Sequence, residues 1–196
     1  RMSATRTRLG LRISGVVQGV GFRPVVHRLA GELGLVGHVG NDAAGVFVEV
    51  EGPSAAVASF TVRVERDAPP LARVDEVRTT PLTPAGDAGD GATFTIVASP
   101  GGGPVATLVP PDVGVCASCR AELFDPEDRR YRHPFITCTD CGPRFTIVRS
   151  LPYDRPTTTM AGFEMCAACR REYHDPDHRR FHAQPIACPD CGPTLA

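Results

Sequence analysis

The sequence contains no lysine and no tryptophan, and its formal net charge is only −1. Without lysine it cannot form a Walker A loop, which needs a Gly-Lys pair followed by Ser or Thr to hold nucleotide phosphates. The balance of charges provides no basic surface of the kind that binds nucleic acid. No stretch reaches the roughly 20 apolar residues of a membrane helix, and the N-terminus lacks the apolar core of a signal peptide. We therefore expect a cytoplasmic protein with no nucleic-acid or membrane partner.

Cysteine is absent from the first half of the chain, and all eight cysteines lie between Cys116 and Cys191. This distribution divides the chain into a part without cysteine and a cysteine-rich part. Glycine and proline are abundant, and a stretch rich in both separates the two parts. We predict a first domain over residues 8–98, a linker over 99–111 and a second domain over 112–196.

The first domain is expected to alternate between strands and helices. Residues 8–14 alternate apolar and polar side chains, which is typical of a half-buried strand. Apolar residues at helical spacing then predict a helix that begins at Pro24 and stops at Gly34. Similar patterns predict the remaining elements: strands over 35–39, 46–50, 74–78 and 94–97, a second helix from Ser54 to about Asp67, and a surface loop over 80–91. The order β-α-β-β-α-β is the ferredoxin-like pattern of an α+β fold.

A glycine-rich stretch joins the first predicted strand to the first predicted helix. It reads Gly15-Val16-Val17-Gln18-Gly19-Val20-Gly21-Phe22-Arg23. Because glycine has no side chain to block a close approach, the backbone N–H groups of such a turn can converge on an anion. Arg23 falls at the expected N-cap, where its guanidinium and the helix dipole would both attract an anion. We interpret the stretch as a cradle for a phosphate or an acyl phosphate; a plain glycine turn is the alternative.

The same stretch resembles the signature of the acylphosphatase family. A second element of that family, Gly-x-Val-x-Asn, is present as Gly37-His38-Val39-Gly40-Asn41. The resemblance implies an acyl-phosphate hydrolase whose catalytic residues are Arg23, which binds the phosphate, and Asn41, which positions the attacking water. It implies the following phosphate-binding residues: Gly15, Val16, Val17, Gln18, Gly19, Val20, Gly21 and Arg23. We expect His27, on an exposed helix face, and His38, at a variable motif position, to be bystanders.

The second domain repeats itself with a period of 50 residues. Each copy reads C-x2-C, eighteen residues, C-x2-C, so that Cys116-Ala-Ser-Cys119 answers Cys166-Ala-Ala-Cys169. This spacing is typical of four-thiolate zinc sites, and four thiolates leave no open position for a substrate water. We therefore predict a small, irregular double zinc-finger domain, with repeats over about 112–145 and 162–196 and two structural zinc ions. Disulfides are the alternative, and they fit a cytosolic chain less well.

The expected zinc ligands are the eight cysteines: Cys116, Cys119, Cys138, Cys141, Cys166, Cys169, Cys188 and Cys191. Pairing of the two knuckles within each repeat is our prediction, although crossed pairing between repeats stays open. Four histidines lie among the cysteines and are expected on the surface or beside the ligands: His133, His174, His178 and His182. The arginine pairs at 129–130 and 179–180 are expected to form salt bridges beside Asp125 and Asp175 rather than to bind nucleic acid.

The two halves together resemble the N-terminal part of the HypF family, the carbamoyltransferases of nickel–iron hydrogenase maturation. The resemblance also includes Gly-Phe-Arg-Pro at 21–24 and Val-Pro-Pro-Asp at 109–112. It implies that this chain is a fragment which hydrolyses carbamoyl phosphate, or another acyl phosphate, as the first step of cyanide-ligand synthesis. It further implies that the complete enzyme passes the carbamoyl group to a HypE-like maturation protein.

Two other classes of function are compatible with the sequence. The first domain could bind an anion without turnover while the zinc domain docks partners, which would make the chain a scaffold. The repeated C-x2-C knuckles would also suit a zinc-dependent, chaperone-like adaptor. The matched positions of Arg23 and Asn41 favour the hydrolase over both alternatives.

Overall fold

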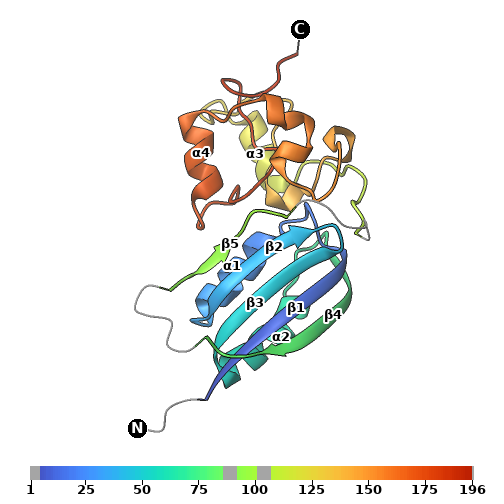
Figure 1. Ribbon diagram of the computed structural model, residues 1–196. Coiled ribbons are helices and arrows are strands. Elements are labelled where there is room, and N and C mark those ends of the chain that lie inside the picture. The colour runs from blue at the N-terminus through green and yellow to red at the C-terminus, as the bar shows by residue number, and fades with distance from the viewer. Residues whose placement is uncertain (1–4, 86–91, 101–106, 196) are drawn as a thin grey trace.

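The computed structural model describes residues 5–85, 92–100 and 107–195. Its first domain is a five-stranded sheet with two helices on one face (Figure 1). The elements, in chain order, are β1 (Arg6–Val16), α1 (Phe22–Glu32), β2 (Val36–Asp42), β3 (Gly45–Pro53), α2 (Ser54–Arg66), β4 (Arg73–Leu82) and β5 (Phe94–Ile96). The strand order is β4-β1-β3-β2-β5; β5 runs parallel to β2, and the other neighbours are antiparallel. The predicted ferredoxin-like α+β fold is confirmed.

The core of this domain lies between the sheet and its two helices. Alternate residues of the central strands, such as Leu11 and Ile13 of β1 and Val48 of β3, are almost completely buried. Since successive strand residues point to opposite faces, this alternation directs one apolar face of the sheet toward the helices. The helices contribute residues at helical spacing, including Val26 of α1 and Phe60 of α2, both 0% exposed. The core thereby fixes the loop between β1 and α1 at one end of the sheet.

Two predicted boundaries are wrong. Helix α1 begins at Phe22 rather than Pro24, because Gly21 adopts a left-handed conformation (φ 80°) and serves as the N-cap. Arg23 is therefore the second residue of the helix and not its N-cap. Pro24 still lies in the first turn, where its missing N–H has no partner to lose. Residues 80–82 belong to β4 rather than to a surface loop; residues 86–91 of that predicted loop, and 101–106 of the predicted linker, lie outside the described residues.

The second domain has little regular structure. Its helices and 3-10 turns are α3 (Ala117–Phe124), η1 (Thr139–Cys141), η2 (Phe145–Ile147), η3 (Arg155–Thr157), η4 (Thr159–Gly162) and α4 (Ala167–His174). In each repeat the first cysteine, Cys116 or Cys166, caps a helix by accepting a hydrogen bond from the N–H three residues later. Each repeat has a small buried cluster made largely of its own cysteine side chains. The domain is thus irregular, as predicted, and has too small an apolar core to fold on burial alone.

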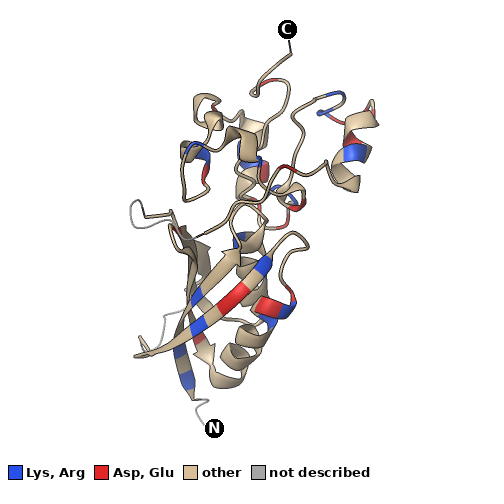
Figure 2. Cartoon of the chain, turned by 90° about the vertical axis from the view of Figure 1, so that its right-hand side faces the viewer, with Lys and Arg blue, Asp and Glu red and all other residues tan. Residues whose placement is uncertain are grey.

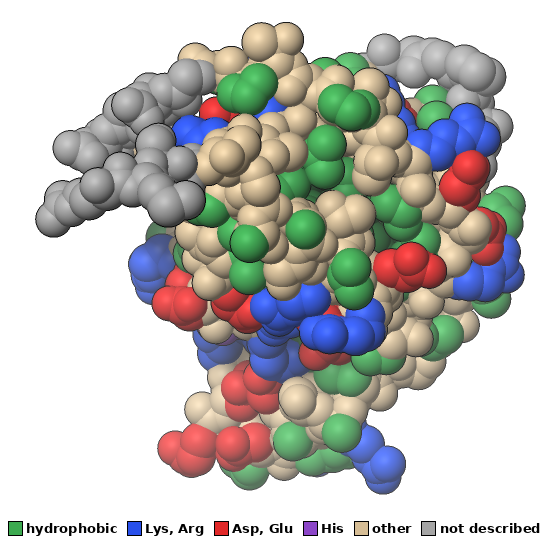
Figure 3. All heavy atoms as spheres, turned by 90° about the horizontal axis from the view of Figure 1, so that it is seen from below, with side chains coloured by type: hydrophobic (Ala, Val, Ile, Leu, Met, Phe, Trp, Pro, Cys, Tyr) green, Lys and Arg blue, Asp and Glu red, His purple; other side chains and the backbone are tan. Residues whose placement is uncertain are grey.

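The second domain sits on the end of the sheet where the β1–α1 loop lies (Figure 1). Acidic and basic residues are interspersed along both domains (Figure 2). The face seen from below carries side chains of both signs without a broad basic patch (Figure 3), in line with the balanced composition. In the described part of the chain, no helix is both long enough and apolar enough to cross a membrane.

Candidate functional site

The predicted cradle is a tight loop whose glycines all need positive φ. Gly15, Gly19 and Gly21 have φ values of 121°, 73° and 80°, which other residues adopt only under strain. Gly15 lies at a bulge between β1 and β4, where a β-carbon would come 2.1 Å from the carbonyl oxygen of Arg73. The remaining predicted cradle residues, Val16 to Val20, follow from the end of β1 into this loop. The glycine pattern therefore encodes the backbone path, as the sequence indicated.

The loop glycines also make room for the second domain. A β-carbon on Gly19 would lie 2.5 Å from Cβ of Pro143 and 3.0 Å from the ring of Tyr153. One on Gly21 would lie 3.2 Å from Cβ of Thr139. These three residues all belong to the cysteine-rich domain, so that domain forms a roof over the loop. The roof could not be predicted from the sequence, because the glycine motif gives no indication of which distant segment packs on the loop.

Gln18 holds the loop in place with its side chain. Its amide nitrogen donates to the carbonyl oxygens of Asp42 and Gly45, at 2.6 and 2.9 Å. Its amide oxygen accepts a hydrogen bond from the backbone N–H of Tyr153 at 2.9 Å. The fully buried Gln18 thus joins the loop to the β2–β3 turn and to the segment between the two fingers. Because the side chain of Gln18 already makes these hydrogen bonds, its backbone N–H is the group that remains for an anion.

Arg23 is buried against the roof and has a partner that the sequence did not suggest. Its side chain is 8% exposed, and its Nη1 lies 2.6 Å from a carboxylate oxygen of Asp154. Its Nη2 donates to the carbonyl oxygen of Tyr153 at 3.3 Å. The guanidinium has five N–H donors, so these contacts leave others for a further anion. Asp154 lies in the segment between the two fingers, 131 residues along the chain, and no local motif marks it.

Asn41 is buried in β2 with an unpartnered side chain. It is 1% exposed, and among the described residues neither its amide oxygen nor its amide nitrogen has a hydrogen-bond partner. Leaving a buried polar atom unpaired costs about 1–3 kcal/mol. Its neighbour in the chain, Asp42, accepts the hydrogen bond from Gln18 that ties this turn to the cradle. Asn41 therefore offers a donor and an acceptor, near the loop, to a water or a ligand.

A small cavity separates the cradle from the roof. Its volume is about 20 Å³, which is room for a water molecule but not for an acyl phosphate. Its lining combines cradle residues with roof residues: Val17, Gly19, Gly21, Phe22, Arg23, Pro24, Cys138, Thr139, Gly142, Tyr153, His182, Ala183, Gln184 and Pro185. The gap between the cradle and the roof is therefore narrow.

His182 faces this cavity from the second finger. Burial lowers its pKa to about 4, and the positive charge of Arg23 lowers the pKa further in the same direction. Burial also raises the pKa of Tyr153, on the same wall, to about 12. Both side chains are therefore neutral at pH 7, and the charge at the cavity wall comes from Arg23.

The half-buried, neutral His182 should make folding stability depend on pH. An unfolded histidine has a pKa of about 6.5, so between pH 6.5 and 4 the unfolded chain binds a proton that the folded chain does not. Stability is then complete above pH 6.5 and falls as the pH is lowered, by about 1 kcal/mol between pH 6.5 and 5.5. Urea unfolding across this range, with zinc content followed in parallel, measures it.

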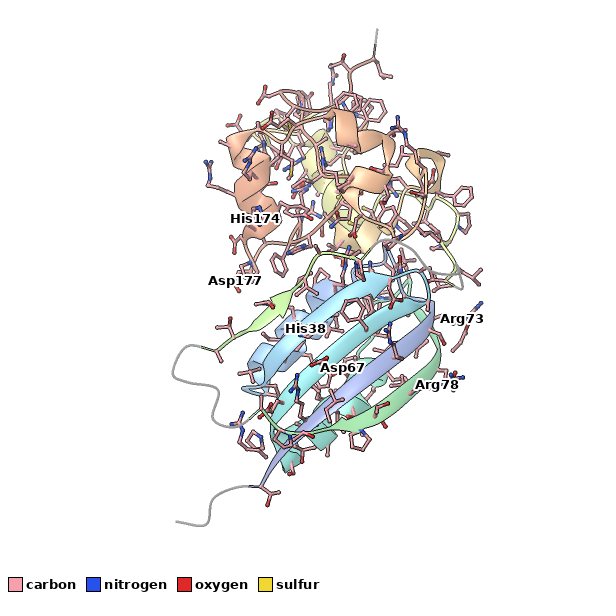
Figure 4. The ribbon with its side chains drawn as sticks, in the orientation of Figure 1. His38, Asp67, Arg73, Arg78, His174 and Asp177 are labelled. Carbon is pink, nitrogen blue, oxygen red and sulfur yellow. The ribbon has the colours of Figure 1, made fainter. Side chains whose placement is uncertain are left out.

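His182→Asn is the matched variant, because asparagine tolerates the left-handed backbone (φ 53°) that His182 adopts. It should reduce the fall in stability between pH 6.5 and 5.5 by about 1 kcal/mol, whatever its effect on absolute stability, while His27 and His133, whose pKa values are also lowered, keep contributing to the rest. His174→Asn, at the exposed end of α4 (Figure 4), should keep the fall. An unchanged pH dependence in His182→Asn would show that another group titrates.

The other histidines fall in three different environments. His27 is half-buried rather than exposed, and it packs edge-on against Phe181 of the roof at 5.2 Å between ring centroids. His38 packs against Phe47 of the neighbouring strand β3 (Figure 4). His133 is 3% exposed, and its Nε2 has no partner among the described residues, so of the two expected positions, on the surface or beside the ligands, it does not take the surface one. Burial lowers the pKa of both His27 and His133.

The structure gathers the cysteines into two groups of four, one for each repeat. The members are Cys116, Cys119, Cys138 and Cys141 in the first group and Cys166, Cys169, Cys188 and Cys191 in the second, with the sulfur atoms of each group within 4.8 Å of one another. Within the groups, neighbouring Sγ atoms are 3.6 to 3.8 Å apart. A disulfide needs about 2.05 Å, whereas a tetrahedron with zinc–sulfur bonds of about 2.3 Å has edges of about 3.8 Å. The thiols therefore fit a four-coordinate metal in each repeat.

Each group of thiols is also contacted by the other repeat. Arg129 donates to Sγ of Cys169 at 3.1 Å. Its neighbour Arg130 is 2% exposed; it pairs with Glu172 at 2.5 Å and donates to the carbonyl oxygen of Ala187 at 2.8 Å. The arginine pair of the first repeat thus stabilises the thiols and the helix of the second.

The reverse contacts repeat this arrangement. Arg179 donates to Sγ of Cys119 at 3.3 Å. Arg180, also 2% exposed, forms an ion pair with Glu122 and donates to the carbonyl oxygen of Thr137 at 2.9 Å. Positive N–H donors beside four thiolates reduce the excess negative charge that a zinc–tetrathiolate site would carry. Each repeat therefore stabilises the four thiols of the other.

These contacts correct one prediction. The arginine pairs form salt bridges, as expected, but with Glu172 and Glu122 of the opposite repeat rather than beside Asp125 and Asp175 of their own. Burial raises the pKa of Glu122 and of Glu172, yet hydrogen bonds from the arginines outweigh burial and hold both pKa values below normal. The 50-residue repeat shows which residues of the two copies are equivalent. It does not show that an arginine of one copy pairs with a glutamate of the other.

Comparison with known proteins assigns both domains. Residues 9–96 match the acylphosphatase family, and residues 115–148 and 165–196 match the HypF finger. The chain is 56% identical over 157 residues to carbamoyltransferase HypF2 of Cupriavidus necator, covering 80% of this chain and 19% of that protein. It is 42% identical over 79 residues to an acylphosphatase of Thermotoga petrophila, covering 40% of this chain and 87% of that protein.

A solved structure matches nearly the whole chain. The crystal structure of full-length HypF in the phosphate- and nucleotide-bound form gives a TM-score of 0.90 at 46% identity, and the match covers 98% of this chain and 25% of that one. A second HypF, from T. kodakarensis, gives 0.80 at 44% identity. The chain spans about a fifth of the length of the curated carbamoyltransferases it matches.

Proposed function

The chain belongs to the acylphosphatase family through its first domain and carries two HypF fingers in its second, and from this premise we propose that it hydrolyses acyl phosphates at the β1–α1 cradle. The observation that carries the proposal is the buried side chain of Asn41, whose two polar atoms have no partner among the described residues, next in the chain to Asp42, which binds Gln18 of the cradle. Such an amide is costly unless a water or ligand uses it. A phosphate cradle with an amide poised to hold water suits hydrolysis of a phosphoryl group.

The proposed reaction uses positioning and charge. The phosphoryl group lies against the backbone N–H groups of residues 15–21 and the free donors of Arg23, which stabilise the charge on its oxygens. Asn41 holds a water in line with the bond that breaks. The water oxygen bonds to phosphorus, the bond from phosphorus to the acyl oxygen breaks, and a phosphate oxygen takes the proton. Carbamoyl phosphate would give carbamate and inorganic phosphate.

Zinc fits the eight thiols, and we propose one ion in each repeat, held by the four cysteines of that repeat. The sulfur spacing, the Arg129 and Arg179 donors beside the thiols and the match to the HypF finger support this choice of metal. Four protein ligands close the coordination sphere, so the ions would stabilise the fold rather than take part in hydrolysis. Thiols held for a metal also suit the reducing cytoplasm, where we place the reaction.

The relatives suggest where the product goes. Their names identify them as carbamoyltransferases, and this chain corresponds to about a fifth of their length. We propose that hydrolysis of carbamoyl phosphate is the first step of carbamoyl transfer for cyanide-ligand synthesis in nickel–iron hydrogenase maturation. The carbamate would pass to another part of the complete enzyme, and the carbamoyl group then to a HypE-like partner.

Replacing Asn41 by alanine tests the water-holding role. The turnover of acetyl phosphate or carbamoyl phosphate should fall about 10²-fold, because the loss of one oriented polar group at the reacting centre costs about that much. Binding of inorganic phosphate, which does not need the water, should stay within about twofold of the parent. Folding stability should not fall, since the variant removes two unpaired buried polar atoms. Phosphate release, phosphate titration and urea unfolding measure the three quantities.

His38→Ala is the matched control for this test. His38 lies on the same strand, three residues away and therefore on the opposite face of the sheet. It should leave turnover within about twofold of the parent. Equal losses in the two variants, or weaker phosphate binding in Asn41→Ala, would argue against a role for Asn41 in positioning water.

One observation favours the scaffold alternative. The cavity between the cradle and the roof, about 20 Å³, is too small for an acyl phosphate. A scaffold would bind phosphate at this loop and release none from an acyl phosphate. Turnover by the zinc-loaded chain separates the two functions: the hydrolase requires it, and its absence in a chain that binds phosphate would favour the scaffold.

A further inference from the structure

We propose that Asp154, in the segment between the two fingers, positions Arg23 for the phosphate, so that the second domain completes the anion site of the first. This inference rests on the proposed function, since it assigns a further residue to the same site. Its basis is the 2.6 Å contact between Nη1 of Arg23 and the carboxylate of Asp154, at side-chain exposures of 8% and 19%. An ion pair this well shielded from water fixes the orientation of a guanidinium more firmly than an exposed one does.

Arg23 is held by the roof at two of its nitrogens. Asp154 contacts Nη1, and the carbonyl oxygen of Tyr153 accepts from Nη2 at 3.3 Å. Arginine has a long side chain with many rotamers, and an unanchored one must lose that freedom when an anion binds. The two contacts remove the freedom in advance and leave the remaining N–H groups for the phosphate. Asp154 would therefore act through Arg23, without touching the reacting atoms.

The segment that carries Asp154 is itself fixed. The backbone N–H of Asp154 donates to Oγ1 of Thr157 at 3.1 Å, and the N–H of Thr157 donates back to its carbonyl oxygen at 2.9 Å. The next residue, Arg155, donates to the carbonyl oxygens of Gln184 and Ile186, both at 2.9 Å. Asp154 is thus tied into the second finger, and its carboxylate is presented to Arg23 from a rigid support.

A carboxylate beside a phosphate-binding arginine could instead compete with the phosphate. A competitor would take the place of the anion and accept hydrogen bonds from the N–H groups of the cradle. In the described residues, no side-chain carboxylate accepts from the backbone of residues 17–21, and the carboxylate of Asp154 pairs with the guanidinium of Arg23. The loop amides are therefore left to an incoming anion, which favours positioning over competition.

The test measures inorganic phosphate binding and acetyl phosphate hydrolysis in zinc-loaded protein with Asp154→Ala and Asp154→Asn. Loss of a charge-assisted contact should weaken phosphate binding and lower kcat/KM by about tenfold in the alanine variant. The asparagine variant keeps the shape and loses the charge, so it should lie between alanine and the parent. Asp177→Asn, at an exposed aspartate of the same domain (Figure 4), should match the parent. Zinc content and circular dichroism confirm that each variant is folded.

A double substitution separates positioning from a merely structural role. If Asp154 acts through Arg23, then Asp154→Ala should not weaken phosphate binding further in an Arg23→Ala background. Tighter phosphate binding or faster turnover in Asp154→Ala would overturn the proposal in favour of competition, and unchanged binding would overturn it outright. Phosphate binding by the parent without turnover would remove the hydrolase but leave the Asp154 assignment open to the same comparison, whereas a parent that binds no phosphate would overturn both.

Discussion

Replacing Cys119 or Cys169 by serine should release zinc and unfold the finger domain while the sheet domain keeps its fold. Both thiols are fully buried, and the surrounding clusters consist largely of cysteine side chains. A structural zinc site contributes on the order of 10 kcal/mol to folding, which exceeds what these small clusters can supply by burial. The sheet domain has its own core, and single-domain acylphosphatases of similar sequence consist almost entirely of that region.

The contacts between the repeats sharpen this expectation. Because Arg179 contacts Cys119 and Arg129 contacts Cys169, damage to one metal group removes support from the other. If the two fingers were independent, each single variant would keep one zinc ion per chain. Because they support each other, we expect each variant to keep less than one. Metal analysis after gel filtration, together with amide exchange in each domain, measures both effects.

Ser118→Ala is the control, since Ser118 is exposed between Cys116 and Cys119 and offers no thiol. It should keep two zinc ions and a folded finger domain. One retained zinc in both cysteine variants would show that the fingers fold independently. Two retained zinc ions would contradict the assignment of the ligands.

Replacing Arg23 by alanine should lower kcat/KM for acyl phosphates by about 10²- to 10³-fold, the usual loss when one donor to a developing anion is removed. Arg23 is the buried cation at the cavity, and its guanidinium keeps donors beyond those that Asp154 and Tyr153 use. Inorganic phosphate should bind more weakly as well, because the arginine contacts the anion in the ground state and in the transition state. Steady-state kinetics and phosphate titration measure the two losses.

Arg28→Ala is the matched control, because Arg28 lies on the same helix, its side chain is 68% exposed, and Glu32 is its one ion-pair partner in the part of the chain that the structure describes. It should change neither quantity by more than about twofold. Arg23→Ala also leaves Asp154 without its partner, so its zinc content and unfolding midpoint are measured first. An Arg23→Ala protein that is folded and fully active would remove the arginine from the proposed site.

Local patterns in the sequence were sufficient to predict the fold and the tight glycine turn between β1 and α1. Apolar and polar residues alternate in β1, and apolar residues recur at helical spacing in α1 and α2, because each element buries one face. Such a pattern involves only residues that are close together in the chain. The glycines at 15, 19 and 21 mark positive φ values, which few other residues tolerate. The start of α1 was placed two residues late because proline signalled a helix start more strongly than Gly21 signalled a cap.

The contacts that complete the site could not be predicted in this way. Asp154 and Tyr153 reach Arg23 across about 130 residues, and neither stands in a motif. The arginine pairs of the repeats were recognised, but their partners lie in the opposite repeat. Such contacts depend on how two domains or two repeats dock, which side-chain periodicity within one segment does not encode.

The most direct test of the account is hydrolysis of carbamoyl phosphate by the zinc-loaded chain in water labelled with ¹⁸O. The account predicts phosphate release faster than the enzyme-free blank, with one labelled oxygen in the phosphate, because water attacks phosphorus in the cradle. Release no faster than the blank, or enzyme-dependent release of unlabelled phosphate, would contradict it.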